Sequence, residues 1–174
     1  MFCFPSLHVV DMERAALTWL GHSCAAIRLD DLLVVTDPVL RARVVHLRRK
    51  GAVDPAALKA VDVILISHIH YDHLDLPSLD RLNRRAVVLV PAGAGGFLRR
   101  RGFRFVREVV RGEEVDLGAV QIRVTHAEHA SARRMGTART QPVGYVIAGS
   151  RSVYFAGDTD LFPAMGDLGM IDVA

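Results

Sequence analysis

Cysteine, aromatic residues and long apolar runs are all scarce in this sequence, and each scarcity excludes a class of protein. The two cysteines, Cys3 and Cys24, cannot build a disulfide scaffold, so we expect reduced thiols and a cytoplasmic location. No apolar run approaches the roughly 20 residues that a membrane-spanning helix needs. The first residues also lack the basic head and apolar stretch of a secretory signal. The sequence therefore predicts a protein without a membrane span.

The composition indicates one folded domain over 1–174. Hydrophobic residues make up 51% of the chain, which suits a substantial core, and the 6% of aromatics leave that core mainly to Val, Leu, Ile and Ala. A net charge of +3 permits an anionic substrate but requires no nucleic-acid partner. Three basic clusters lack interleaved aromatic residues, so we interpret them as solvated surface: 48–50, 99–101 and 133–134.

Short apolar or alternating segments separated by turn residues predict many β-strands and few, short helices. Helices are expected from near Pro55, within 74–83, and over 95–101 before Gly102. The basic segment 41–50 is expected to be a loop, and 170–174 looks like the start of another buried strand. The other strands are expected over 16–20, 24–29, 32–36, 61–66, 86–90, 103–110, 113–117, 120–125, 143–148 and 152–156. This pattern indicates an α+β or α/β class with a mostly β core.

A cluster of potential metal ligands directly follows the expected strand at 61–66. His68, His70, Asp72 and His73 fall within six residues, where a loop can turn them toward one point. Imidazole and carboxylate groups suit zinc and also manganese or iron. His68 and His70 would share one side of an extended backbone, and Asp72 and His73 could serve a second ion. A purely structural reading explains four such residues at this spacing poorly.

The segment 67–75, Ser-His-Ile-His-Tyr-Asp-His-Leu-Asp, resembles the metal-binding signature of the metallo-β-lactamase superfamily. Its Tyr and trailing Leu-Asp are similar to those of ascorbate-6-phosphate lactonase and N-acyl-phosphatidylethanolamine phospholipase D-like proteins. The resemblance extends over about residues 17–172 and implies an α+β fold, the αββα sandwich. Four further segments resemble this branch in the same order: 19–23 (Trp-Leu-Gly-His-Ser), 36–38 (Thr-Asp-Pro), 127–133 (Ala-Glu-His-Ala-Ser-Ala-Arg) and 154–159 (Tyr-Phe-Ala-Gly-Asp-Thr).

The resemblance implies a metal-dependent hydrolase with Zn²⁺ or Mn²⁺ and up to two ions. A metal-activated water would act on a phosphodiester, lactone or related ester of a small-molecule or lipid-like substrate. Asp72 would bind metal and also orient the nucleophile as the catalytic residue. The implied metal ligands are His68, His70 and His129 for the first ion, Asp72 and His73 for the second, and Asp158 as a bridge between them.

Two of these assignments leave an alternative open. His126 lies three residues before His129 and competes with it for the same metal position, although the neighbouring residues favour His129. Asp158 could instead be an ordinary turn aspartate at the end of a strand.

Four further residues are candidates around the site. Arg133 is expected to contact an anionic group of the substrate, because guanidinium binds phosphate in a bidentate way. Tyr71 is expected to line the same pocket. His22 and Asp37 are expected to orient metal ligands, and the alternative for each is a turn residue with local hydrogen bonds only.

One departure concerns the second ion. Members of the superfamily usually complete that site with a further histidine beyond Ile171, and no histidine follows His129 in this sequence. We therefore expect the sandwich to lack its C-terminal strands and helices and the second site to be incomplete. An uncovered sheet edge would then allow a homo-oligomer. The alternative functions are a catalytically incomplete metal-binding relative and a nuclease of the same fold.

Overall fold

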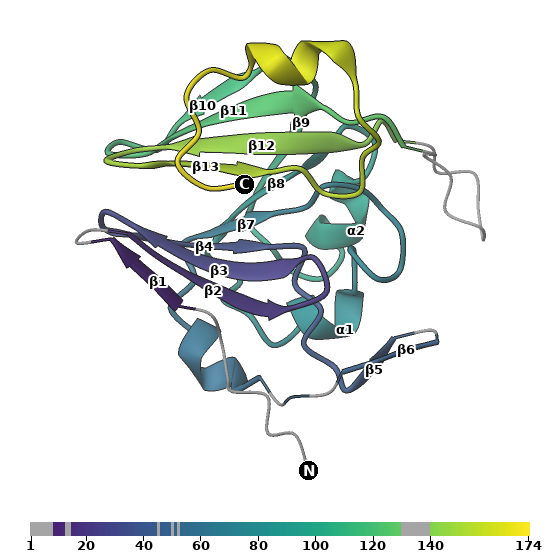
Figure 1. Ribbon diagram of the computed structural model, residues 1–174. Coiled ribbons are helices and arrows are strands. Elements are labelled where there is room, and N and C mark those ends of the chain that lie inside the picture. Colours follow the sequence, from purple (N-terminus) through teal and green to yellow (C-terminus); the bar gives the residue numbers. More distant parts are fainter. Residues whose placement is uncertain (1–8, 13–14, 45, 50, 52, 130–139) are drawn as a thin grey trace.

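Two stacked β-sheets make up most of the protein (Figure 1). The computed structural model describes residues 9–12, 15–44, 46–49, 51, 53–129 and 140–174. The larger sheet has the order β1-β2-β3-β4-β7-β8-β9; its strands are antiparallel from β1 to β4 and parallel from β4 to β9. These strands are β1 (Val9–Met12), β2 (Ala15–Gly21), β3 (Cys24–Leu29), β4 (Leu32–Thr36), β7 (Val63–Leu65), β8 (Val87–Pro91) and β9 (Phe105–Val109).

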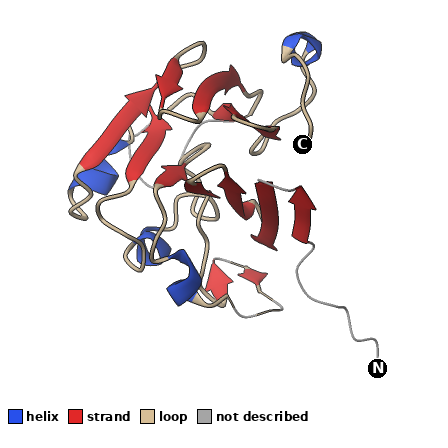
Figure 2. Ribbon diagram, turned by 90° about the vertical axis from the view of Figure 1, so that its left-hand side faces the viewer, coloured by secondary structure: helices blue, strands red, loops and turns tan. Residues whose placement is uncertain are grey.

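The smaller sheet is antiparallel and has the order β10-β11-β12-β13. Helices are few and short, as the blue segments of Figure 2 show. Among the described residues, none of the helices has the length and apolar character needed to cross a membrane. The remaining elements are β10 (Glu114–Asp116), β11 (Gln121–His126), β12 (Val143–Ala148), β13 (Ser152–Phe155), the hairpin β5 (Arg43–Val44) and β6 (Leu47–Arg48), the 3-10 helices η1 (Pro55–Leu58) and η2 (Pro163–Asp167), α1 (Leu76–Leu79) and α2 (Gly95–Arg99).

Strand β7 is buried on both faces and divides the apolar core into two layers. Successive side chains of a strand point to opposite faces, so Ile64 packs with the layer that includes Leu79 of α1 and Leu98 of α2. Val63 and Leu65 pack with the layer shared with the smaller sheet. A strand covered on both sides reads as a continuous apolar run. The sequence of β7, Val-Ile-Leu, is such a run.

The expected α+β class is confirmed, and most strands lie within two residues of their predicted bounds. Two expectations were wrong. The basic loop over 41–50 contains the short hairpin β5–β6. The segment 170–174 is not a buried strand: Val173 makes a single parallel bridge to Val153, and Met170 is 94% exposed. Its side chains pack against too little of the core to form a further buried strand.

The parallel strands bring the predicted ligands to one edge of the larger sheet. β4 and β7 run side by side and both end at this edge, β4 before Asp37 and β7 before the segment that contains Ser67 and His68. Ligands of open α/β sheets bind outside the carboxyl ends of such strands. Val143, at the start of β12, donates a backbone hydrogen bond to the Ser67 carbonyl at 3.0 Å. The smaller sheet therefore adjoins the same edge.

Candidate metal centre

A buried carboxylate, that of Asp37, organises the loop that follows β7. Its Oδ1 accepts a hydrogen bond from the Ser67 backbone N–H at 2.8 Å, and its Oδ2 accepts one from the Ser67 hydroxyl at 2.5 Å. The same Oδ2 lies 2.7 Å from Nδ1 of His73. The side chains of both Asp37 and His73 are fully excluded from solvent. One carboxylate therefore fixes both ends of the predicted ligand segment.

These contacts leave the metal-facing nitrogen of His68 free of a proton. The Ser67 hydroxyl donates its proton to Asp37, so Nδ1 of His68, 2.9 Å from the hydroxyl oxygen, is the donor in that contact. The remaining nitrogen, Nε2, then carries a lone pair. Burial, followed by the nearby imidazoles of His73 and His70, lowers the pKa of His68 to about 2. A neutral imidazole is the form that binds a metal.

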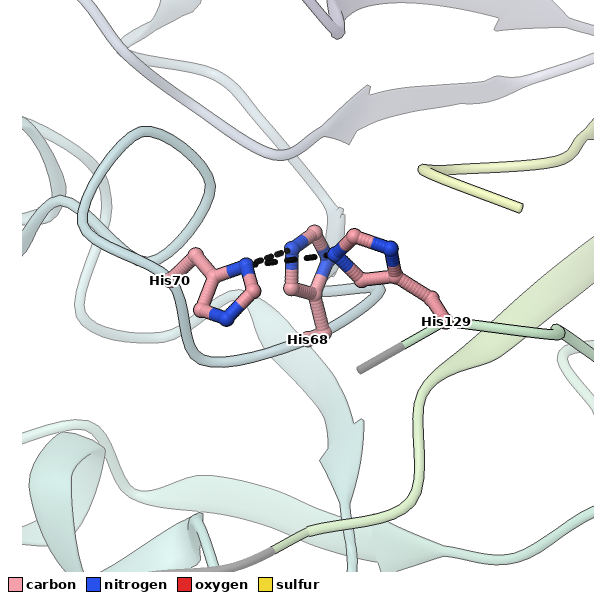
Figure 3. A group of neighbouring side chains, drawn as sticks. All are labelled: His68, His70 and His129. Carbon is pink, nitrogen blue, oxygen red and sulfur yellow. Dashed lines mark hydrogen bonds between the residues drawn. The ribbon is translucent and has the colours of Figure 1, made fainter. Parts of the chain in front are cut away.

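Three imidazoles converge at this point (Figure 3). Nε2 of His68 is 2.9 Å from Nδ1 of His70, and Nε2 of His129 is 3.3 Å from that same Nδ1. Nitrogens about 2.05 Å from a tetrahedral zinc ion are roughly 3.3 Å apart. The two separations from His70 are therefore close to the spacing that one ion requires, and all three nitrogens lie within 4.8 Å of one another.

A second group of side chains adjoins the first through His73. Its Nε2 lies 3.2 Å from Oδ2 of Asp158 and 4.0 Å from Oδ2 of Asp72. That Asp72 oxygen is 3.1 Å from Nε2 of His22. The ligand atoms of His22, Asp72 and His73 lie within 4.8 Å of one another, as do those of Asp37, His68 and His73.

The electrostatics of this second group favour a cation. Burial lowers the pKa of His73, but the nearby carboxylates of Asp158 and Asp37 outweigh burial and raise that pKa to about 10. The contact with His73 likewise lowers the pKa of Asp158 to about 2. The two carboxylates thus attract positive charge to the position of His73 Nε2. Although Asp158 is near, this buried nitrogen has no hydrogen-bond partner of acceptable geometry within the described part of the chain. A metal ion would satisfy it, and the donor set fits zinc, manganese or iron.

The two alternatives left open by the sequence have distinct geometries. Nε2 of His126 lies 3.0 Å from Oε2 of Glu128, and its ring packs against Phe162, so His129 is the one that lies within the imidazole cluster. Asp158 does not merely cap a turn, because its carboxylate meets His73.

The Asp158 loop is held close to the histidine loop by Gly157. Gly157 has φ +64°, and a Cβ placed there would lie 2.6 Å from the Cβ of Ser67. A backbone bridge between Glu128 and Asp160 joins the same loop to the segment that carries His129. Ligands from three distant parts of the chain are thereby brought to one place.

Of the two predicted substrate contacts, the structure describes only Tyr71. Arg133 lies outside the described residues. Tyr71 is 40% exposed beside Asp72, which places it at the open side of the site. A cavity of about 440 Å³ adjoins His129 and includes Arg111, a cation that the sequence did not single out. Arg111 lies in the turn after β9 and belongs to no recognisable motif, so its position beside His129 could be found only from the fold.

Two arginines of the basic segment 41–50 make hydrogen bonds that hold the loops around the site in place. Arg41 donates to both carboxylate oxygens of Asp75, from Nε at 2.9 Å and from NH2 at 2.5 Å. Asp75 in turn caps α1 by accepting from the Ser78 backbone N–H at 3.2 Å. Arg49 donates to the carbonyls of Leu20 and Val39. The interpretation of 48–50 as solvated surface was therefore wrong for Arg49.

Known proteins share both the sequence pattern and the fold. Residues 33–174 match the family described as the beta-lactamase superfamily domain. A UPF0173 metal-dependent hydrolase from Opitutus terrae is 34% identical over 166 residues, covering 91% of this chain and 70% of that protein. An uncharacterized protein of Mycobacterium tuberculosis is also 34% identical, over 95% of this chain and 48% of its own length. The chain thus spans about half the length of that relative.

Among solved structures, CmlA, a diiron β-hydroxylase from Streptomyces venezuelae, is similar with a TM-score of 0.70 and 28% identity. The match covers 94% of this chain and 34% of CmlA. The sequence match, the two stacked sheets and the position of the histidines at the sheet edge agree with one another. The chain belongs to the beta-lactamase superfamily, within the group that includes the UPF0173 metal-dependent hydrolases.

Proposed function

We propose that this protein is a hydrolase that uses a metal-activated water to cleave a phosphodiester, lactone or related ester. The observation that carries the proposal is the convergence of His68, His70 and His129 on one point, next to a second group around His73. Three protein ligands with an open position are typical of catalytic metal sites. The relatives named as metal-dependent hydrolases support the same reaction class.

A divalent cation, when bound here, supplies a water of lowered pKa and polarises the oxygen of the bond under attack. The chain's own part in the reaction is positioning. Asp72 is a carboxylate with 31% side-chain exposure, on the open side of the cluster. It is placed to accept a hydrogen bond from an attacking water and to orient it. Zn²⁺ and Mn²⁺ are the proposed ions, and Fe²⁺ belongs in the same comparison because CmlA is a diiron protein.

The proposed substrate is a small or lipid-like ester or phosphoester, as in the ascorbate-6-phosphate lactonase and N-acyl-phosphatidylethanolamine phospholipase D-like branch. Arg111 in the cavity beside His129 supports an anionic group on that substrate. Arg133 and Tyr71 are further proposed contacts. A cytoplasmic location, the absence of a specific nucleic-acid partner and a possible homo-oligomer remain predictions from the sequence.

The test is turnover of bis-p-nitrophenyl phosphate and of a simple lactone by metal-free protein supplied with Zn²⁺, Mn²⁺ or Fe²⁺. We expect at least one ion to restore hydrolysis and the double variant His68→Ala/His70→Ala to abolish it. The matched control is His46→Ala, which removes an exposed histidine between β5 and β6. Turnover that persists in the double variant would show that the proposed metal mechanism is wrong.

Binding without turnover of either substrate under any ion would favour a non-catalytic metal-binding relative. A nuclease predicts something different: affinity for nucleic acid that falls steeply with added salt near physiological ionic strength. Circular dichroism of every variant separates a lost site from a lost fold.

A further inference from the structure

We infer that His22 is a direct ligand of a second divalent cation, which it holds together with Asp72, His73 and Asp158. The inference rests on the proposed function, since it concerns the second ion of the same centre. It replaces the expectation that His22 only orients another ligand.

The turn that carries His22 holds its backbone in an unfavourable conformation. His22 has φ +54°, in the left-handed region that is unfavourable for a residue with a Cβ. The turn is anchored on both sides, because Trp19 Nε1 donates to the His22 carbonyl at 2.7 Å and the Thr36 hydroxyl donates to the Ser23 carbonyl at 2.9 Å. Strain of this kind, where the surroundings enforce it, is found at functional sites.

The anchored turn places the imidazole over the second group of ligands. Nε2 of His22 lies 3.1 Å from Oδ2 of Asp72, and the rings of His22 and His73 are 5.0 Å apart between centroids. Oδ2 of Asp72 is also the oxygen that faces Nε2 of His73, at 4.0 Å. A residue that merely oriented Asp72 could bond its other oxygen. His22 instead points at the oxygen that faces the shared centre.

An independent observation is the unsatisfied nitrogen of His73. Its side chain is fully buried, Nδ1 is taken by Asp37, and none of the described residues offers Nε2 a partner of hydrogen-bonding geometry. Ligands of one tetrahedral ion are roughly 3.3 Å apart, and the distances from Asp72 to His22 and from His73 to Asp158 are 3.1 and 3.2 Å. The ligand atoms of His22, Asp72 and His73 lie within 4.8 Å of one another, and Asp158 joins this group through its contact with His73.

The ligand chemistry distinguishes this second site from the first. Two imidazoles and two carboxylates neutralise a divalent ion, whereas the first site offers three neutral imidazoles. The second site is also more open, with side-chain exposures of 35% for His22, 31% for Asp72 and 41% for Asp158. Because this exposure lets water compete for the ion, we expect the second ion to exchange faster and to bind more weakly than the first.

In the experiment, metal-free 174-residue protein is titrated with Co²⁺ while isothermal calorimetry measures the heat of binding and visible spectroscopy measures the absorption of the bound ion. The number of bound ions per chain is then counted after gel filtration. The wild type should bind two ions of unequal affinity. His22→Gly, which relieves the backbone conformation while removing the imidazole, should weaken the second ion at least tenfold and leave the first unchanged. Its spectrum at saturating Co²⁺ should also lose intensity, because water replaces a nitrogen ligand. His46→Ala is the matched control and should behave as wild type.

Each outcome separates this inference from the proposed function. Two ions bound by His22→Gly with wild-type affinities, or a saturated spectrum identical to that of the wild type, would overturn the ligand role of His22. Hydrolysis dependent on His68 and His70 would still stand in that case. A second variant, His22→Asn, keeps a residue that tolerates the left-handed conformation, so parallel loss in both variants excludes a folding defect as the cause.

Discussion

Asp37 and His73 form a buried carboxylate–imidazole pair, with 2.7 Å between Oδ2 and Nδ1. Through Ser67 the same carboxylate also holds His68, so one residue sets the proton positions of two imidazoles that would serve different ions. Carboxylates that accept from metal-bound histidines fix the ring orientation and raise ligand basicity. The two candidate sites are therefore coupled through one buried carboxylate.

The first prediction follows from that coupling. Asp37→Asn should lower the affinity of both ions by roughly 10- to 100-fold, the usual effect of losing such a partner. Competition with a chelating dye measures both affinities. Asp116→Asn is the control, since its carboxylate accepts only a local turn N–H from Gly118 at 2.8 Å and should leave metal affinity unchanged. Loss at one site alone would contradict the shared role of Asp37.

The second prediction tests the close approach at Gly157. Gly157→Ala should destabilise the fold by roughly 2–4 kcal/mol, because alanine at φ +64° is strained and its Cβ would lie 2.6 Å from Ser67. Urea denaturation measures the change in unfolding free energy. Gly166→Ala provides the matched control, since a Cβ there meets nothing within 4 Å. Equal stability of the two variants would show that the Asp158 loop can move away freely.

Much of the site could be predicted because its ligands follow strands that the sequence marks clearly. The apolar run of β7 ends directly before Ser67 and His68, so the fold class and the position of the ligand loop were both accessible. His129 could be preferred over His126 only from its neighbours. The spatial separation of the two histidines depends on the path of the chain after β11, which periodicity does not encode.

The unpredicted features depend on long side chains that reach across the fold. Arg41 meets a carboxylate 34 positions later, and Arg49 meets a carbonyl 29 positions earlier. A guanidinium has no local signal for such a partner, so neither contact could be predicted, and the cluster that contains Arg49 was interpreted as solvated surface. Likewise 170–174 has the composition of a strand, yet only Val173 of this segment packs against the core cluster and Met170 stays exposed. Composition alone does not reveal whether a neighbouring surface exists.

The third prediction concerns the pair formed by Arg41 and Asp75. The Asp75 side chain is only 3% exposed, so Arg41→Ala leaves a buried carboxylate without its strongest partner. We expect a loss of roughly 1–3 kcal/mol in unfolding free energy, moderated because Ser78 still donates to Asp75. Arg43→Ala, an exposed arginine on β5, should change stability by less than about 0.5 kcal/mol. Chemical denaturation compares them, and a neutral Arg41→Ala would mean that water replaces the guanidinium.

The fourth prediction uses the buried thiol of Cys24. Burial raises the pKa of Cys24 from the ordinary 9.0 to about 12, and its side chain is inaccessible. In a Cys3→Ser background, which leaves Cys24 as the only cysteine of the sequence, Ellman's reagent at pH 8 should label the unfolded protein fully and the folded protein only as fast as it unfolds. Rapid labelling of the native protein would contradict this burial.

The same pKa shift predicts how stability changes with alkaline pH. The folded state keeps the Cys24 proton up to about pH 12, whereas the unfolded state loses it from about pH 9. The contribution of this group is therefore constant below pH 9 and falls as pH rises above 9, because the unfolded state then binds fewer protons. Cys24→Ala should remove this part of the alkaline slope in urea melts. An unchanged slope would assign the loss of stability to other groups.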